Sequence, residues 1–256
     1  MKRLTIFIYG AVSYAVFLAS LLYAVAFLGN WTPGSIDAPA TESAWKALAI
    51  DAGLLSLFAL QHSIMARQWF KRAWTRIIPE PAERSTYVLL SSVLLLLLFR
   101  QWRPIGGVIW NATGTAGEVI LTCTFAAGLL IVLLSTFLIN HFDLFGMRQV
   151  YLHLMGKPYT QLQFRTPFFY RFVRHPLYVG WLLTFWSAPV MTAAHLLFAG
   201  MTTAYILVAI QFEEADLVAM HGEKYSEYRR QVPMIVPSIP AASQGSRDIA
   251  TANSGR

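Results

Sequence analysis

Long apolar runs constrain this chain more than any other feature of its sequence. A helix needs about 20 consecutive apolar residues to cross the hydrocarbon core of a bilayer, because each residue advances it by only about 1.5 Å. Several runs approach that length, which makes lipid the solvent for much of the chain. The pattern predicts four spanning helices, at residues 4–28, 46–66, 86–102 and 117–140.

Two further apolar stretches lie close together near the C-terminal end. They cover residues 177–193 and 196–213, with only the region of Ala194 and His195 between them. So short a break cannot leave the bilayer and re-enter it with slack, so we expect a tight helical hairpin, with His195 capping its turn. The predicted fold is an all-α integral membrane protein with four spanning helices plus this C-terminal hairpin, giving five to six membrane helices.

The charge content excludes an ordinary water-soluble domain. Only 13% of the residues are charged, whereas soluble domains have about a quarter. The net charge of +7 can indicate nucleic acid, anionic lipid or an anionic ligand as a partner. Because the cations lie between the apolar runs, we expect membrane lipid as the partner, with no nucleic acid and no metal. The single cysteine, Cys123, lies in an apolar run and cannot form an internal disulfide.

The positions of the cations also orient the helices. Basic residues concentrate at the N-terminus, in the loop 67–85 and in the segment 141–175, whereas the opposite loops contain only Lys46, Arg100 and Arg103. Basic loops remain on the cytoplasmic side, so we expect an inner-membrane protein with an even number of crossings and both termini cytoplasmic. The chain then divides into spanning helices at 1–140, a cytoplasmic segment with the hairpin at 141–237, and a disordered tail at 238–256.

Polar and aromatic residues cluster at the two bases of the hairpin. One base reads YRFVRHPLYVGW from Tyr170 to Trp181, and the other begins with Glu213 and Glu214. Pro176 suits the first turn of a helix, where its missing N–H costs nothing. Ionisable residues at the membrane edge indicate a functional site, although arginine and aromatic side chains can also serve only as interfacial anchors. The two clusters together favour a site.

These motifs resemble those of a known superfamily. RHPLYVG, EEADL and GEKYSEYRRQVP, in this order, are similar to the C-terminal signature of the isoprenylcysteine carboxyl methyltransferases. The segments QHSIMAR (61–67), PEPAERSTYVL (79–89) and NHFDLFGMRQVYL (140–152) look more particularly like the bacterial methanethiol S-methyltransferases. This resemblance implies that S-adenosylmethionine is the cofactor and that a small volatile thiol, methanethiol, is converted to dimethyl sulfide. It also implies that the C-terminal region binds the cofactor.

Residue by residue, the resemblance places the cofactor in the C-terminal region. In chemical terms, Glu213 suits the methionine ammonium, and Arg174 or Arg165 suits the carboxylate. Tyr225 and Tyr228 can either contact the cofactor or pack a short tail helix. The predicted cofactor site consists of Gln163, Phe164, Arg165, Tyr170, Arg174, His175, Pro176, Leu177, Tyr178 and Glu213, where Tyr170 or Tyr178 covers the adenine or faces the sulfonium.

The thiol acceptor requires a base, because the thiolate is the nucleophile and an alkyl thiol is mostly protonated near neutral pH. His141 can accept the proton while Asp143 fixes its tautomer, with Arg148 nearby, so these three are the catalytic candidates. Alternatively, Asp143 caps a helix and His141 lies at the interface. His62 and its neighbour Gln61 are further candidates, against which stands a simple interhelical hydrogen bond.

Other functions are weighed against thiol methylation. In the prenylcysteine enzymes an arginine meets the substrate carboxylate one turn before the aligned glutamate, and Ala209 stands at that position here. This difference favours a neutral acceptor. The alternatives are a prenylcysteine carboxylate or a phospholipid amine as acceptor, or a non-catalytic membrane accessory protein of nitrogen-oxide respiration. The oligomeric state is left open.

Overall fold

Helices make up most of the computed structural model, which describes residues 2–237. The predicted tail at 238–256 lies outside the described residues. The long helices are α1 (Lys2–Leu28), α2 (Ala44–Ala66), α4 (Glu83–Gln101), α5 (Ala116–Ile139) and α9 (Ala193–His221). The short ones are α3 (Gln68–Trp74), α6 (His141–Leu144), α7 (Met147–Leu154), α8 (Pro176–Trp186) and α10 (Glu223–Gln231), with 3-10 turns at Glu80–Ala82 and Phe168–Arg171. The strands are β1 (Val108–Asn111) and β2 (Val190–Thr192).

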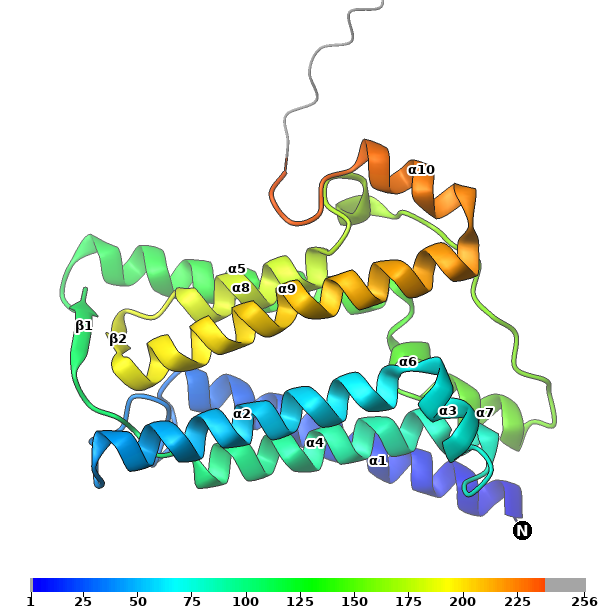
Figure 1. Ribbon diagram of the computed structural model, residues 1–256, viewed down its shortest axis with the longest axis horizontal. Coiled ribbons are helices and arrows are strands. Elements are labelled where there is room, and N and C mark those ends of the chain that lie inside the picture. The colour runs from blue at the N-terminus through cyan, green and yellow to red at the C-terminus, as the bar shows by residue number, and fades with distance from the viewer. Residues whose placement is uncertain (1, 238–256) are drawn as a thin grey trace, which may run out of the picture.

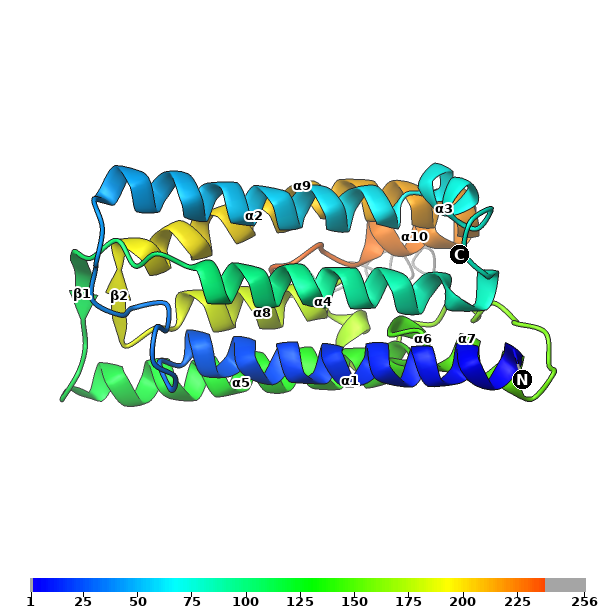
Figure 2. The same ribbon diagram turned by 90° about the horizontal axis from the view of Figure 1, so that it is seen from below.

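The long helices lie side by side in two layers. Helices α1, α4 and α2 form one layer, and α5, α8 and α9 form the other (Figures 1 and 2). Helices α3, α6, α7 and α10 gather at one end, which also holds the start of α1 and is called the polar end below. Strands β1 and β2 lie at the opposite end, called the sheet end.

The helices confirm the predicted class of membrane protein. Among the described residues, five helical segments are long and apolar enough to cross a bilayer: Lys2–Leu28, Ala44–Ala66, Glu80–Gln101, Ala116–Ile139 and Ala193–His221. The third begins earlier than predicted, because a 3-10 turn with proline at its start leads directly into α4. The chain is therefore a multi-pass, all-α membrane protein.

The C-terminal hairpin is present, but its turn is not where the sequence suggested. Helix α8 ends at Trp186 and α9 begins at Ala193, so the break covers residues 187–192 and not Ala194 and His195. The residue that caps α9 is Thr192, whose side chain accepts from the backbone N–H of His195, 3.2 Å away. At 11 residues, α8 is about 16 Å long and covers only about half of the hydrocarbon core.

A small antiparallel sheet explains the position of this break. Strand β2 pairs with β1, and the preceding carbonyls of Ala188 and Pro189 accept from Trp110 Nε1 and the Ala112 N–H at 2.9 and 2.8 Å. Pro189 cannot continue a helix, because it lacks a backbone donor. These contacts therefore satisfy backbone carbonyls of the break that would otherwise lack a donor.

The loop between α1 and α2 is fastened to the hairpin through Asp37. Its carboxylate contacts His195 Nδ1 at 2.9 Å and accepts from the Thr192 hydroxyl at 2.6 Å. His195 Nε2 in turn lies 3.1 Å from the carbonyl oxygen of Phe185. Because a carboxylate and a carbonyl both accept, His195 satisfies both contacts only when both of its ring nitrogens carry hydrogen.

We expect Asp37→Asn to lower the free energy of unfolding at neutral pH by about 1.5–3 kcal/mol, the usual worth of a hydrogen bond to a charged group. Burial works to raise the pKa of Asp37, but the hydrogen bond and positive charge of His195 hold it below the ordinary value. The contribution is therefore present above the unfolded pKa of about 3.9 and is lost as pH falls through the lower folded value. Thermal unfolding in detergent from pH 3 to 7 measures both effects, and equal unfolding temperatures at neutral pH would refute this prediction.

Candidate active site

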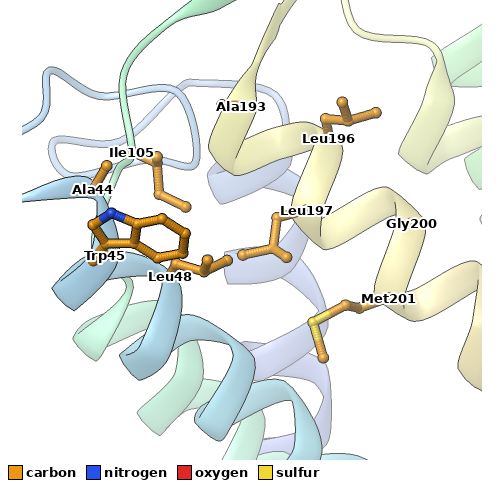
Figure 3. A pocket seen from close by; sticks show the side chains of 9 residues that line it. All are labelled: Ala44, Trp45, Leu48, Ile105, Ala193, Leu196, Leu197, Gly200 and Met201. Atoms are coloured by element: carbon orange, nitrogen blue, oxygen red, sulfur yellow. The ribbon is translucent and has the colours of Figure 1, made fainter.

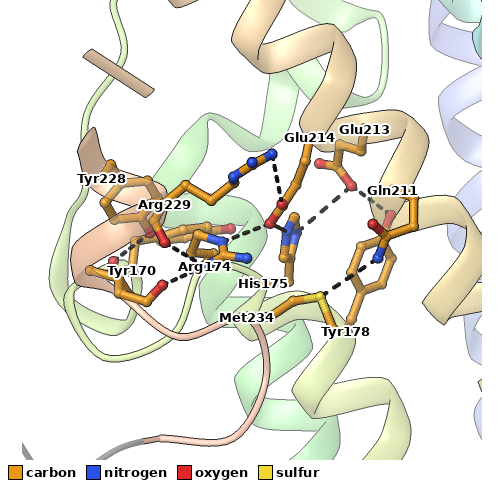
Figure 4. A network of polar contacts seen from close by, with 11 residues as sticks. Tyr170, Arg174, His175, Tyr178, Gln211, Glu213, Glu214, Tyr228, Arg229 and Met234 are labelled. Atoms are coloured by element: carbon orange, nitrogen blue, oxygen red, sulfur yellow. Dashed lines mark hydrogen bonds and ion pairs between the residues drawn. The ribbon is translucent and has the colours of Figure 1, made fainter. Parts of the chain in front are cut away.

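The two polar clusters predicted from sequence meet at the polar end of the bundle. Arg174 and His175 immediately precede α8, whose first residue is Pro176. Glu213 and Glu214 lie near the end of α9. The packing of α8 against α9 brings the two bases of the hairpin into hydrogen-bond contact (Figure 4).

Glu214 is the buried carboxylate of the pair. It accepts from Arg174 Nε at 2.6 Å and lies 3.0 Å from His175 Nε2, and its side chain is only 7% exposed. Arg229 of α10 adds a weaker contact at 3.9 Å. Because cationic and hydrogen-bonding partners surround the carboxylate, Glu214 connects α9 to the start of α8 and to α10.

The segment after α10 folds back across the start of α8. The backbone N–H of Arg174 donates to the carbonyl of Pro233 at 2.9 Å, and that of His175 donates to Met234 at 3.2 Å. The guanidinium of Arg174 also donates to the carbonyls of Arg229 and Val232. Arg174 therefore serves mainly to fasten the C-terminal segment, which leaves it little capacity for a cofactor carboxylate.

Glu213 differs from its neighbour in having unused acceptor capacity. Its side chain is 44% exposed. It accepts one hydrogen bond, from the Tyr178 hydroxyl at 2.9 Å, and His175 Nδ1 lies 3.9 Å away. Successive residues on a helix point about 100° apart, which is why Glu214 turns toward Arg174 and His175 while Glu213 turns toward Tyr178 (Figure 4).

Aromatic side chains surround this site on its α10 side. The ring of Phe164 lies 5.3–5.6 Å from those of His221, Tyr225 and Tyr228. Tyr225 is 2% exposed, so its role is packing. The Tyr228 hydroxyl donates to the carbonyl of Tyr170 at 2.6 Å. Burial raises the pKa of Tyr228 to about 12, so this phenol stays neutral at physiological pH.

The remaining predicted cofactor residues divide into buried and exposed sets. Pro176 is buried and Leu177 is half-buried, whereas Gln163 and Arg165 are exposed. Within the described residues, neither Gln163 nor Arg165 makes a hydrogen bond or ion pair. Burial, followed by the charge of Glu213, raises the pKa of Tyr170. Arg165 is thus an available cation, and Tyr170 is a neutral ring beside Tyr228.

The predicted pairing of His141 with Asp143 is wrong. His141 Nε2 lies 2.7 Å from the Tyr14 hydroxyl, and Nδ1 lies 2.8 Å from Thr136 Oγ1. Because Thr136 donates its own hydrogen to the carbonyl of Leu133, Nδ1 must carry the hydrogen and Nε2 must accept from Tyr14. The chain turns sharply at the end of α5, which directs His141 toward α1 and away from Asp143.

Asp143 is paired with Arg148 instead, at 2.9 Å, and also accepts from the Tyr159 hydroxyl at 3.3 Å. Arg148 donates further to the carbonyl and the hydroxyl of Thr160, so this group fastens the connection between α7 and α8. Burial lowers the pKa of His141, which keeps the ring neutral. Catalysis by His141, Asp143 and Arg148 stays a prediction, and the geometry does not support it as a unit because Asp143 pairs with Arg148 and not with His141.

Two cavities lie away from the glutamates. A groove of about 520 Å³ at the sheet end is lined only by apolar residues of α2, α9 and the segment before β1 (Figure 3). Its last lining residues are Gly200 and Met201, about 20 Å along α9 from Glu213. A second cavity, of about 430 Å³, lies between α1 and α7 beside Arg148. Neither contains the groups that recognise an amino-acid ammonium.

Comparison with known proteins points to one family. A family model described as phospholipid methyltransferase matches residues 121–224. A protein named methanethiol S-methyltransferase from Crocosphaera subtropica is 60% identical over 240 residues, 93% of this chain and 94% of the relative. A protein of the same name from Mycobacterium tuberculosis is 52% identical over 238 residues, 93% and 98% of the two chains. Nurim from Homo sapiens is 33% identical over 192 residues, 72% and 73%. No solved structure matches the chain.

Proposed function

This chain belongs to the methanethiol S-methyltransferase family, and from that premise we propose that it methylates methanethiol with S-adenosylmethionine to give dimethyl sulfide. The observation that carries the placement of the cofactor is the contrast between the two adjacent glutamates. Arg174 and His175 occupy the carboxylate of Glu214, whereas Glu213 is half-exposed, accepts from the Tyr178 hydroxyl and has acceptor capacity left for a cation.

Residues at the polar end suit each part of the cofactor. The Glu213 carboxylate receives the methionine ammonium through a charge-assisted hydrogen bond. Arg165, which has no partner among the described residues, receives the carboxylate, and Tyr170 and Tyr178 present aromatic surface to the adenine or the sulfonium. When bound, the sulfonium supplies the electrophilic methyl group. The protein's own tasks are to align the thiol, to exclude water and to remove the thiol proton.

The acceptor that suits this site is neutral and small. Ala209 lies one turn before Glu213 on α9, between the apolar residues Val208 and Ile210. This stretch of α9 offers no cation to a substrate carboxylate. A prenylcysteine carboxylate would therefore reach the site without a charged partner, whereas methanethiol requires none.

We place the polar end on the cytoplasmic side of the inner membrane. The start of α1, the connection from α2 to α4, the segment from α6 to α8, and α10 all lie at this end and hold most of the cations (Figure 1). Of the Lys and Arg residues that the structure describes, only Lys46, Arg100 and Arg103 lie at the sheet end. This asymmetry follows the preference of basic loops for the cytoplasm, where S-adenosylmethionine would be supplied.

The reaction is tested directly on membranes that contain the protein. Incubation with methyl-labelled S-adenosylmethionine and methanethiol is expected to release volatile labelled dimethyl sulfide. Membranes without the protein provide the background. If the purified protein binds S-adenosylhomocysteine but forms no volatile product from methanethiol, the proposed acceptor is wrong.

Changing Glu213→Gln is expected to weaken cofactor binding while preserving the shape of the side chain. Loss of a hydrogen bond to a charged group costs about 1.5–3 kcal/mol, so the Kd for S-adenosylhomocysteine should rise about tenfold to 150-fold. Isothermal titration of the purified protein measures this change. The matched control is Glu223→Gln, an exposed glutamate at the same end whose ion pair within residues 2–237 is with the exposed Arg230. Equal Kd values for Glu213→Gln and the unaltered protein would remove Glu213 from the site.

A further inference from the structure

A group of connected polar side chains lies inside the bundle where α2 and α4 meet. His62 Nε2 lies 2.7 Å from the hydroxyl of Tyr87, and His62 Nδ1 lies 3.2 Å from Ser91 Oγ. Ser91 in turn donates to the side-chain oxygen of Gln61 at 3.3 Å. Polar groups in membrane helices are costly, so a connected set of four is a candidate for function.

The hydrogen bonds fix the direction in which protons can move. Since Ser91 uses its hydrogen on Gln61, its oxygen accepts from His62, and Nδ1 must carry the ring hydrogen. His62 Nε2 is then unprotonated, and its lone pair accepts from the Tyr87 hydroxyl. No described residue donates to the oxygen of Tyr87. That oxygen can therefore accept a proton from a ligand while Tyr87 passes its own to His62.

This group adjoins the cofactor site proposed above. The ring of His62 lies 6.4 Å from that of Tyr205 on α9, and Tyr205 precedes Glu213, the acceptor of the Tyr178 hydroxyl, by about two helical turns. The Tyr205 hydroxyl also accepts from Ser63 of α2 at 3.3 Å. Helices α2, α4 and α9 therefore meet around His62, about two turns of α9 before Glu213.

Charged groups of both signs lie around Tyr87. Arg84 places its guanidinium carbon 5.2 Å from the centre of the Tyr87 ring, and it is held by donation to the carbonyl of Leu144 at 2.8 Å. From α9 the facing titratable groups are Glu213 and Tyr205, and from α8 the facing group is Tyr178. Arg84 is thus the cation close to the ring, on the side where the chain enters α4.

We propose that Tyr87 is a catalytic residue that receives the thiol proton and that His62 is the positioning residue that accepts the proton Tyr87 gives up. This inference rests on the proposed thiol methylation. The S–H bond of methanethiol breaks, and its proton moves to the Tyr87 oxygen as the Tyr87 hydrogen moves to His62 Nε2. The electron pair left on the thiol sulfur would form the new S–CH₃ bond. The bond between the methyl carbon and the cofactor sulfonium would break, and its electron pair would remain on the cofactor sulfur. The proton later leaves His62 for water at the polar end.

The test is Tyr87→Phe, which keeps the ring and removes only the oxygen. Its kcat for methanethiol is expected to fall about 10²-fold near neutral pH, as for loss of a general base, while the Kd for S-adenosylhomocysteine stays unchanged. The variant depends on thiolate already present in solution, so its deficit should shrink by up to about tenfold per pH unit as the pH rises toward the pKa of the thiol.

Two further variants keep this test decisive. Tyr9→Phe removes a comparable phenol hydrogen bond between helices, to Thr86 at 2.9 Å, and is expected to leave kcat unchanged. His62→Gln cannot take up the proton and should repeat the pH-dependent deficit even if Tyr87→Phe folds poorly. A deficit that is constant across pH, or an unaltered kcat, would overturn the inference while the unaltered protein still forms dimethyl sulfide. If the unaltered protein forms none, the proposed function itself fails.

Discussion

Glu214→Ala is expected to lower the free energy of unfolding by about 3–5 kcal/mol, the usual cost of removing one partner from a buried ion pair. The change leaves the guanidinium of Arg174, only 10% exposed, without its carboxylate, and it removes the partner of His175 Nε2. Because Arg174 also holds the carbonyls of Arg229 and Val232, the segment after α10 should detach from the start of α8.

Thermal unfolding in detergent, combined with limited proteolysis, measures both consequences. We expect cleavage after α10 to appear in Glu214→Ala at temperatures where the unaltered protein is intact. Glu227→Ala is the control, because Glu227 is an exposed residue of α10 whose hydrogen bond from the Gln231 side chain lies at the surface. If both variants unfold at the temperature of the unaltered protein, Glu214 does not hold the site together.

Gly128→Leu is expected to destabilise the protein by about 3 kcal/mol, at the upper end of the range for overpacked cores. A Cβ atom at Gly128 of α5 would lie 2.7 Å from the carbonyl oxygen of Gly180 in α8 and 2.6 Å from Thr184 Oγ1. The opposing atoms include backbone, which cannot rotate aside. Small residues are what allow two membrane helices to approach this closely, and the position of α8 sets the position of His175 and Tyr178.

The same glycine-to-leucine substitution at an exposed position serves as the control for this prediction. Gly53 of α2 is exposed, and a Cβ atom there would meet nothing within 4 Å. We therefore expect Gly53→Leu to unfold at the same temperature as the unaltered protein or slightly higher, since glycine is a poor helix former. Equal stability of Gly128→Leu and Gly53→Leu would mean that α5 and α8 are not in backbone contact.

Sequence alone could predict the spanning helices, because their length and apolarity are local properties of the chain. It misplaced the turn of the hairpin, although Pro189 is a visible signal that a helix must end before it. The pairing of β2 with β1 was beyond reach, because it joins residues about 80 positions apart and a three-residue strand has no periodicity of its own.

The glutamate doublet shows what a closer reading of periodicity would have found. Ile206 and Ile210 are buried in α9, and residues four apart share one face of a helix. The next position on that face is Glu214, so its burial follows from the spacing, and Glu213 must point elsewhere. The partner of each glutamate did not follow, since Arg174 and Tyr178 are 40 and 35 positions away.

The histidines required tertiary structure for the same reason. His141 was paired with Asp143 because they are close in sequence, yet its partners are Tyr14 of α1 and Thr136 of α5. His62 is a candidate from the sequence alone, but its proposed role depends on its contact with Tyr87. Tyr87 lies in the motif at 79–89, which does not indicate which helix its side chain faces. A single sequence cannot show which helices are neighbours.

Ultraviolet cross-linking of methyl-labelled S-adenosylmethionine to the purified protein tests the central claim most directly. The label should attach to peptides from the stretch between Phe168 and Gly180 or from the end of α9 near Glu213, and excess S-adenosylhomocysteine should abolish it. Competed label confined to the sheet end, at residues 44–48 or 193–201, would contradict a cofactor site between the start of α8 and the glutamates.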